Sequence, residues 1–269
     1  MKKMKLFLLV LMFCAALPSQ AWDRTRHDAI AYIAECNLTP RAKKNIARYL
    51  EHSIVYYASW MDKYRSTPEF RDVEHVSYVD ADMQLVDTLR KGKTNCVVEL
   101  MRAVDRLKDY RNMSDSLVRL NLMYVIHIVG DMHCPSHVKY PGCKSGRADL
   151  NGKKMSYHAM WDWGVLDGAH GWSYSEYRLL LDTFSKREKA AMAKGTPREW
   201  LHETAVACRV IYDWQRADET YDKQFVMDTY LLPERQLILA SYRLAAVLND
   251  LFGGIVKIVF DIADLGRTR

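Results

Sequence analysis

Proline and glycine are scarce in this chain, at 7 and 12 of its 269 residues. The sequence contains no proline-rich linker, no low-complexity tract and no internal repeat. Nothing therefore divides the chain into domains joined by flexible linkers. Strand signals are also sparse, whereas apolar residues recur at helical spacing from end to end. A chain of this length can bury one large core, and nothing requires two domains.

Only one long apolar run is present, from Leu6 to Leu17, and it follows a cluster of lysines. It is too short to span a bilayer comfortably, which disfavours a retained membrane anchor. Ser19-Gln20-Ala21 then places small residues at the two positions that a signal peptidase reads. We therefore predict a signal peptide at residues 1–21, a mature domain at residues 22–269 that begins with Trp22, and an exported protein, periplasmic or secreted.

The charge balance is mild, and the cysteines are odd in number. The 39 basic residues fall to 36 without the three signal lysines and face 33 acidic residues. A net charge of +3 does not by itself indicate nucleic-acid binding. Five cysteines remain in the mature chain, so at least one is unpaired in a monomer. Cys134 and Cys143 flank the turn-like sequence KYPG, and for this pair we predict a disulfide.

Helical periodicity predicts a mainly α fold, a single compact domain of many helices. Thr39-Pro40 and Thr196-Pro197 carry helix start signals. The segment 139–157 contains three turn-forming dipeptides, and it is predicted to be the one small hairpin or loop insertion. The predicted helices cover residues 24–36, a segment from 40 onward, and 79–91, 94–111, 114–133, 158–167, 174–193, 197–215 and 226–252.

Two polar residues stand in the most apolar of these helices. His127 and Asp131 share one helical face with Leu117, Leu120 and Tyr124, and their neighbours are nearly all apolar. Burying an imidazole and a carboxylate costs several kcal/mol unless they are paired or bind a metal. A single His–Asp hydrogen bond in the core would account for this pair on its own.

The same spacing then recurs further along the chain. His158 and Asp162 are again four residues apart on one predicted helical face, where both side chains can reach one ion. His137 follows the first pair, and Asp62 and His75 lie upstream. Imidazole nitrogen with carboxylate oxygen is a ligand set that zinc favours. Because these groups exceed what one tetrahedral site requires, the sequence predicts a cluster of metal ions.

The order of the motifs resembles that of one enzyme family. The predicted N-terminal Trp22 and His27 are followed by SWMD, by His75, and then by HIVGDMHCPSH and HAMWD. This combination is similar to that of the trinuclear zinc nucleases of the S1/P1 type, within the zinc phospholipase C/P1 nuclease superfamily, over essentially the whole mature chain. The resemblance implies that superfamily's helical fold, three zinc ions per chain, cleavage of single-stranded nucleic acid and removal of 3′-phosphates.

The resemblance also implies a role for each motif residue. Asp62 would orient a water shared by two zinc ions, whose pKa falls toward ~7 so that hydroxide can attack phosphorus. Arg65 would clamp the scissile phosphate; taken without the family, it is an ordinary solvated charge. The implied ligands are Asp62, His75, His127 and Asp131 for the first zinc; His137, His158 and Asp162 for the second; and Trp22 (α-amino nitrogen and carbonyl oxygen), His27 and the bridging Asp131 for the third.

The base-binding positions depart from the family pattern. Val76 and Tyr78 stand where family nucleases carry an aromatic residue and an acid that bind the base. Of the usual Gly-Gly-Asn loop, only Asn151 remains to make a base contact. We therefore expect single-stranded DNA, RNA and nucleotides as substrates, with weak discrimination among bases. We also expect a monomer with no stable membrane association after signal cleavage.

Three alternatives remain open at this point. A zinc phospholipase C-like enzyme shares the implied fold, but the short interval from Trp22 to His27 and an Asp rather than a Glu at position 162 favour the nucleases. A broad phosphomonoesterase is the second alternative. The third, a zinc-stabilised binding module without catalysis, would close every coordination position, whereas catalysis needs exchangeable water.

Overall fold

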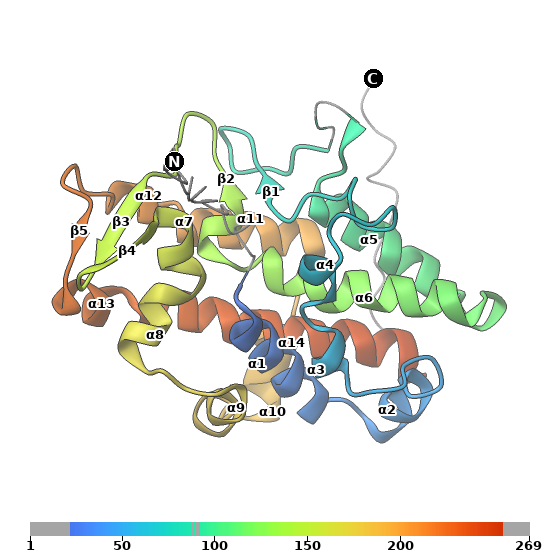
Figure 1. Cartoon of the computed structure of the whole chain (residues 1–269). Coiled ribbons are helices and arrows are strands. Elements are labelled where there is room, and N and C mark those ends of the chain that lie inside the picture. Colours follow the sequence, from blue (N-terminus) through green and yellow to red (C-terminus); the bar gives the residue numbers. More distant parts are fainter. Residues whose placement is uncertain (1–21, 88, 90–91, 255–269) are drawn as a thin grey trace, which may run out of the picture.

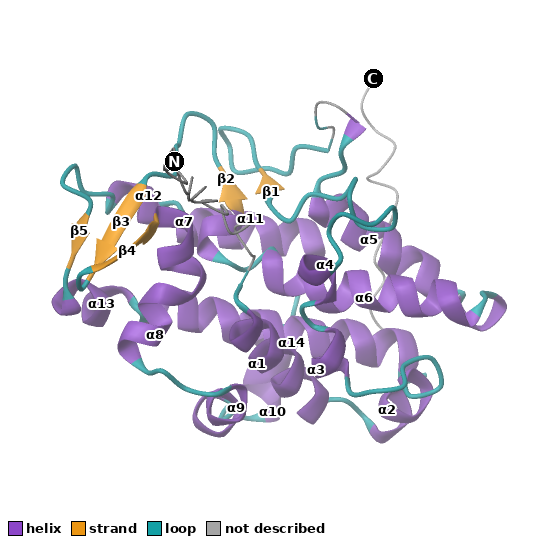
Figure 2. Ribbon diagram, viewed as in Figure 1, coloured by secondary structure: helices purple, strands orange, loops and turns teal. Residues whose placement is uncertain are grey.

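The computed structural model describes residues 22–87, 89 and 92–254 (Figure 1). The predicted signal peptide, residues 1–21, lies outside the described residues. Helices make up most of the described chain, and the strands are few and short (Figure 2). The prediction of a mainly α domain is therefore confirmed.

A long helix, α14 (Leu231–Phe252), forms the centre of the fold. It is buried almost all round, because its sequence from Gln236 to Leu248 is nearly continuous in apolar and small residues. Figure 1 shows it running across the molecule, with α1 (Arg24–Cys36) lying in front of it. The helix α6 (Asp115–Asp131) packs on both. These three helices together supply a large share of the hydrophobic core.

Shorter helices surround this centre, and several begin where the sequence predicts. Thr39 caps α2, with Pro40 in the first turn, and Thr196 forms a capping box with Glu199 at the start of α11. The remaining helices of the first half are α2 (Pro40–Ile46), α3 (Ile54–Tyr57), α4 (Trp60–Lys63), α5 (Cys96–Leu107), η2 (Tyr110–Asn112) and η3 (Pro135–His137). Those of the second half are α7 (Tyr157–Ala159), η4 (Met160–Gly164), α8 (Val165–Ala169), α9 (Tyr174–Leu181), α10 (Lys186–Met192), α11 (Pro197–Cys208), α12 (Val210–Asp213) and α13 (Lys223–Thr229).

Two small sheets complete the described fold. β1 (Ser77–Tyr78) pairs in parallel with β2 (Val138–Lys139). β3 (Arg147–Leu150) and β4 (Lys153–Ser156) form an antiparallel hairpin, and β5 (Thr220–Tyr221) adds to β3 in parallel. Asn151 and Gly152 both have positive φ, as a two-residue hairpin turn of this twist requires. The predicted insertion is thus a hairpin, and the sequence gives no sign of the added strand β5.

The structure corrects the prediction of a helix at 79–91. Its described residues form a turn instead: the Asp80 carboxylate accepts hydrogen bonds from the backbone N–H groups of Asp82 and Gln84, and Met83 has a φ of 61°. The predicted helix 174–193 is interrupted between α9 and α10, where Ser185 caps a new helix. Leu117, expected on a buried face, is half exposed, because α6 extends beyond the core at its N-terminal end.

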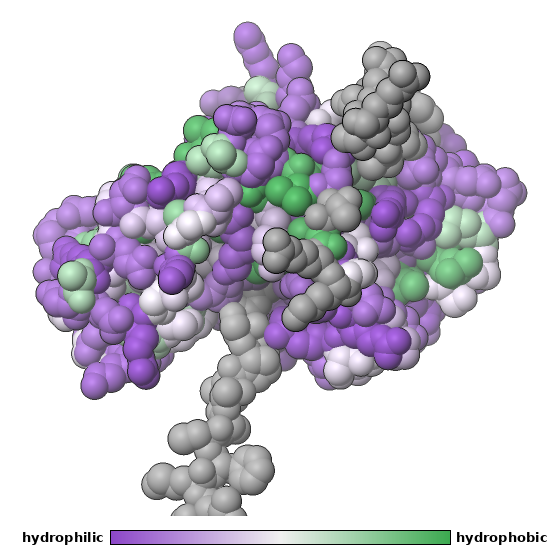
Figure 3. All heavy atoms as spheres, turned by 90° about the horizontal axis from the view of Figure 1, so that it is seen from above, coloured by the Kyte–Doolittle hydropathy of each residue, from purple (hydrophilic) through white to green (hydrophobic). Residues whose placement is uncertain are grey.

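The predicted Cys134–Cys143 disulfide is wrong. All five cysteines of the described chain are free, and the Cys134 thiol donates a hydrogen bond to Asp162 instead. Seen from above, the surface is mostly hydrophilic, with hydrophobic side chains gathered near the middle of that face (Figure 3). Among the described helices, none combines the length and the apolar character needed to cross a bilayer.

Candidate metal centre

The buried end of α6 gathers the largest group of candidate ligands around Asp131. Its Oδ2 lies 3.0 Å from Nε2 of His127 and 3.3 Å from Nδ1 of His75. Its Oδ1 lies 3.3 Å from Nε2 of His27 and 3.6 Å from Nδ1 of His137. One carboxylate therefore faces four imidazole rings that come from four separate segments of the chain.

Asp62 of α4 and His75, just before β1, complete this side of the centre. Nδ1 of His75 is 3.4 Å from Oδ1 of Asp62 and 3.2 Å from Nε2 of His127. The His127 ring is held by its other nitrogen, since Nδ1 donates to the Ala58 carbonyl at 2.8 Å. Such a backbone partner fixes both tautomer and ring orientation, and it leaves Nε2 free to bind an ion.

A second group forms where η3 meets η4. Nε2 of His137 is 3.2 Å from Nε2 of His158 and 3.3 Å from Oδ1 of Asp162, and His158 is 3.1 Å from Oδ2 of Asp162. Nδ1 of His137 donates to the His75 carbonyl, so this ring is also held from behind. Asp162 lies in a π-helical turn, a rare conformation that is frequent at functional sites.

The donor atoms around Asp131 fit metal ligation better than hydrogen bonding. Both oxygens of Asp131 and Nε2 of His27 are buried, and none has a hydrogen-bond partner, although histidine nitrogens lie at 3.0–3.6 Å from those oxygens. With zinc–ligand bonds of about 2.0–2.1 Å, two ligands on a tetrahedral ion lie about 3.3 Å apart. The separations within each group cluster near this value, so the residues present could hold metal ions.

Burial and opposite charges set the pKa values of this centre. Burial lowers the pKa of His127, but the carboxylates of Asp131 and Asp62 outweigh it and raise that pKa to about 9. Burial raises the pKa of Asp131, yet His127 and His137 hold it well below its usual value. For His75 burial prevails, and its pKa is lowered. Asp131 therefore stays ionised at neutral pH and presents negative charge to any cation bound there.

His27 reaches Asp131 because a glycine leaves room for its ring. A Cβ added at Gly130 would lie 2.9 Å from Nδ1 of His27, closer than real Cβ contacts allow. The His27 ring also stacks on His127, with centroids 4.3 Å apart. The carbonyl of the same Gly130 accepts a hydrogen bond from the indole of Trp22 at 3.0 Å. Gly130 thus brings the start of the described chain and His27 against the buried end of α6.

A buried arginine fixes the segment around Trp22. Arg26 pairs with Asp23, whose carboxylate also caps α1, and with Asp167 beyond η4. Its guanidinium also donates to the Trp163 carbonyl at 3.3 Å. A buried charge held by two carboxylates and a carbonyl is costly to displace. This network ties the first turn of α1 to the segment that carries Asp162.

The two candidate substrate contacts lie in different surroundings. Arg65 follows Asp62 by one helical turn, and Nη2 of Arg65 lies 3.4 Å from Oδ1 of Asp62, so its half-buried guanidinium borders the centre. Asn151 instead occupies the exposed hairpin turn. The four-residue strand β4, roughly 13 Å long at 3.3 Å per residue, separates it from the segment of His158. The structure brings Arg65 to the candidate ligands and does not bring Asn151 there.

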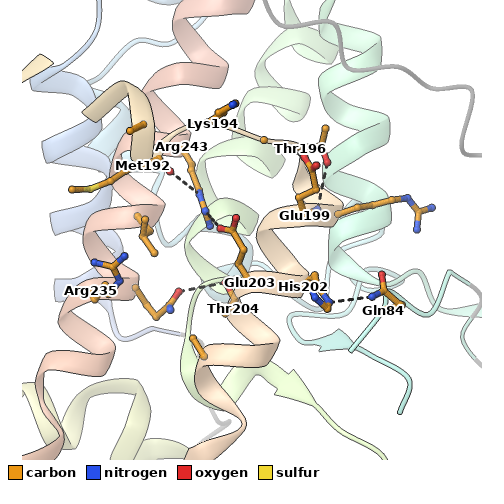
Figure 4. A pocket seen from close by; sticks show the side chains of 16 residues that line it. Gln84, Met192, Lys194, Thr196, Glu199, His202, Glu203, Thr204, Arg235 and Arg243 are labelled. Atoms are coloured by element: carbon orange, nitrogen blue, oxygen red, sulfur yellow. Dashed lines mark hydrogen bonds and ion pairs between the residues drawn. The ribbon is translucent and has the colours of Figure 1, made fainter. Parts of the chain in front are cut away.

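A pocket of about 1120 Å³ lies between α10, α11 and α14. Figure 4 shows Arg243 pointing between Met192 and Glu203 at this pocket. The same guanidinium donates to Nε2 of His133 at 2.8 Å, while Nδ1 of His133 donates to the Val129 carbonyl. Burial and Arg243 hold the pKa of His133 well below its usual value, so this ring stays neutral. It braces the turn that follows Asp131.

Sequence reasoning missed three residues that shape the centre. Gly130 had a readable signal, because an isolated glycine inside an apolar helix usually has a packing reason. Cys134 and Ser136 had none: both contact Asp162, which lies more than 25 residues further along the chain. Only the folded chain reveals these two contacts.

Comparison with known proteins places the chain among nucleases. The sequence model of the S1/P1 nuclease family matches residues 22–253. Endonuclease 2 of Arabidopsis thaliana is 23% identical over 279 residues, covering 92% of this chain and 96% of that protein. Endonuclease 4 of the same plant is 22% identical, covering 86% and 89%. Nuclease S1 of Aspergillus oryzae is 24% identical over 193 residues, covering 66% and 67%.

The family match spans all the segments that form the centre, from Trp22 through α14, and it agrees with the helical fold and with the motif order of the sequence. The curated relatives share with the chain most of their length, and their names are those of endonucleases and of nuclease S1. The chain therefore belongs to the S1/P1 nuclease family, and it is a hydrolase that acts on phosphodiester bonds.

Proposed function

We propose that this protein is a zinc-dependent phosphoesterase that cleaves single-stranded DNA and RNA and removes 3′-phosphates from nucleotides. One observation carries the proposal: buried imidazole and carboxylate atoms converge around Asp131, where both carboxylate oxygens and Nε2 of His27 have no hydrogen-bond partner. A core that leaves such atoms unpaired is costly unless a cation joins them. The membership of the chain in a nuclease family supplies the class of reaction.

Three zinc ions per chain are the occupancy we propose for this centre. Asp131 has candidate partners on both of its oxygens, so it suits a bridging carboxylate. The proposed ligand sets are Asp62, His75, His127 and Asp131; His137, His158 and Asp162; and His27 and Asp131 with the amino nitrogen and carbonyl oxygen of Trp22. The contact of the Trp22 indole with Gly130 supports the third set, because it anchors the residue beside His27.

Zinc bound here would supply a nucleophile at neutral pH and neutralise charge on the phosphate. Asp62 is nearly buried and borders two histidines, so its carboxylate can orient the nucleophile and accept its proton. Arg65 is a third exposed and one turn away, so its guanidinium can contact both water and a bound phosphate. Its planar fork would then bind two phosphate oxygens and stabilise the charge of the transition state.

Export is part of the proposal, because the third ligand set needs a free amino group at Trp22. Removal of residues 1–21 would create that amine, whose pKa in model peptides is about 8 and which binds zinc in its neutral form. The mature domain would then be residues 22–269, in the periplasm or outside the cell. We also propose that it works as a monomer without stable membrane association.

Metal counting and a comparison of four substrates test this function. We expect about three zinc ions per chain by elemental analysis and chelator-sensitive hydrolysis of single-stranded DNA, RNA and a 3′-mononucleotide. Because Val76 and Tyr78 replace the usual base-binding pair, rates on the four homopolymeric oligonucleotides should differ little, and a strong preference for one base would point to a different pocket. Hydrolysis of phosphatidylcholine alone, or fewer than two zinc ions after zinc-replete refolding, would contradict the proposal.

A further inference from the structure

Asp162 is held by a thiol and a hydroxyl from one turn. Oδ1 of Asp162 accepts a hydrogen bond from the Ser136 hydroxyl at 2.9 Å and from the Cys134 thiol at 3.0 Å. The thiol and hydroxyl are themselves 3.3 Å apart. All three side chains are buried, so water does not compete for these bonds. They are the only two side-chain hydrogen bonds that the described chain makes to this carboxylate from outside the candidate ligands.

The turn after α6 aims both donors at the same oxygen. The backbone N–H of Cys134 bonds to the Asp131 carbonyl, and that of His137 bonds to the Cys134 carbonyl, each at 3.0 Å. Pro135 starts the short helix η3, so residues 134, 136 and 137 are fixed relative to one another. A single rigid turn therefore presents one candidate ligand, His137, together with two donors to a second candidate ligand, Asp162.

The two donors leave Asp162 with one oxygen directed at His158. Oδ2 lies 3.1 Å from Nε2 of His158 and accepts no hydrogen bond from the turn. Hydrogen-bonded carboxylates cannot rotate freely, and partners of this kind typically contribute 10–100-fold to metal affinity. The thiol is the donor in this contact, because a carboxylate oxygen can only accept.

We propose that Cys134 and Ser136 are positioning residues for the second zinc site: they fix the Asp162 carboxylate so that it binds the ion held by His137 and His158. This rests on the proposed function, since it concerns the same metal centre. Neither residue touches the substrate in this proposal, and Cys134 is a hydrogen-bond donor rather than a metal ligand. The role is specific to a thiol or hydroxyl at these two positions.

Zinc affinity tests this proposal directly. The zinc-loaded mature protein and its variants Cys134→Ala, Ser136→Ala and the double variant are titrated against a competing chelator. We expect each single variant to bind its weakest zinc more loosely, and the double variant to lose about 10–100-fold in affinity for that ion. Cys134→Ser keeps a donor at the same place, so it should bind within about threefold of the wild type. Unchanged affinity in the double variant would overturn the proposal.

A buried cysteine elsewhere provides the matched control. Cys208 is fully buried in α11, and among the described residues it forms no hydrogen bond with a candidate ligand. Cys208→Ala therefore removes a core thiol of the same size, and it should change thermal unfolding in chelator as much as Cys134→Ala does while leaving zinc affinity unchanged. A zinc affinity that falls equally in Cys208→Ala and Cys134→Ala would mean a general loss of packing, and the positioning role would be wrong.

Two further measurements separate this inference from the proposed function. If Asp162→Asn lowers zinc affinity and the double variant does not, the inference fails while the proposed function stands; if Asp162→Asn has no effect, the ligand assignment itself fails. In cobalt-substituted protein, a thiolate-to-cobalt charge-transfer band that disappears in Cys134→Ser would show direct ligation by Cys134 and refute positioning. The absence of that band is the expected result.

Discussion

Gly130→Ala tests whether the room left beside α6 determines metal content. The new Cβ would lie 2.9 Å from Nδ1 and 3.1 Å from Cε1 of His27. To restore an ordinary contact of about 3.5 Å between the new Cβ and the His27 ring, the ring must move by roughly 0.5 Å. Metal sites tolerate deviations of about 0.2 Å in ligand distance. We therefore expect His27 to lose its place as a ligand, so that about two zinc ions remain and hydrolysis falls at least tenfold.

The same substitution should change stability little. Replacing glycine by alanine within a helix favours the helix by about 1 kcal/mol, whereas crowding a packed core costs about 1–3 kcal/mol. The two effects oppose each other, so thermal unfolding of the metal-free protein should differ by no more than about 2 kcal/mol in free energy. Loss of metal with nearly unchanged unfolding distinguishes a displaced ligand from a damaged fold.

The assay has three measurements. Elemental analysis after zinc-replete refolding gives the metal content, initial rates on a single-stranded oligonucleotide give the activity, and thermal unfolding in chelator gives the stability of the metal-free protein. Gly168→Ala is the matched control, because its Cβ would crowd two methyl groups of Val226 at 3.3 Å, within α8 and away from the candidate ligands. It should keep three zinc ions. If Gly130→Ala also keeps three zinc ions and the wild-type rate, the argument about His27 is refuted.

Three further predictions concern the same centre. A protein made in the cytoplasm with Met ahead of Trp22 has an amide in place of the free amine, so about two zinc ions and a severely reduced rate are expected; equal activity, once mass spectrometry confirms the retained Met, would contradict the third site. Asp131→Asn should be the most damaging single change, because one carboxylate faces candidate ligands of two ions, and elemental analysis should find more than one zinc lost. Because the pKa of His127 is raised to about 9, a proton competes with zinc below that pH, and apparent zinc affinity measured by chelator competition should rise from pH 6.5 to 9; a flat profile would exclude His127 as a ligand.

Local patterns in the sequence predicted most of the helices and the histidines and aspartates that the structure gathers in the centre. The spacing of four residues between His127 and Asp131, and again between His158 and Asp162, is readable because it depends only on helical geometry. The second pair lies in a π-helical turn rather than an α-helix. The wider turn was not predictable, yet it keeps both side chains within reach of one point.

The failures have equally local causes. Apolar residues at 79, 83 and 86 have the spacing of a helical face, which led to the prediction of a helix at 79–91. In the structure the Asp80 carboxylate accepts hydrogen bonds from two backbone N–H groups and stabilises a turn instead. The break before α10 was signalled by Ser185 and Glu188, a capping box that the apolar periodicity obscured. In both cases, short-range polar contacts outweighed the hydrophobic pattern.

The Cys134 contact failed for a different reason, because it depends on distant parts of the chain. From the sequence, a thiol near KYPG in an exported protein favours a disulfide. In the fold, the turn after α6 faces the π-helical segment, where an ionised carboxylate is a better partner for a buried donor than a second thiol. Burial makes the charge of the Asp162 carboxylate unfavourable unless a cation or hydrogen-bond donors compensate it. Burial also strengthens each hydrogen bond to that carboxylate, because water does not compete for it. The turn from Asp131 to His137 therefore joins packing to chemistry, because it carries two candidate ligands and both hydrogen-bond donors to a third, Asp162.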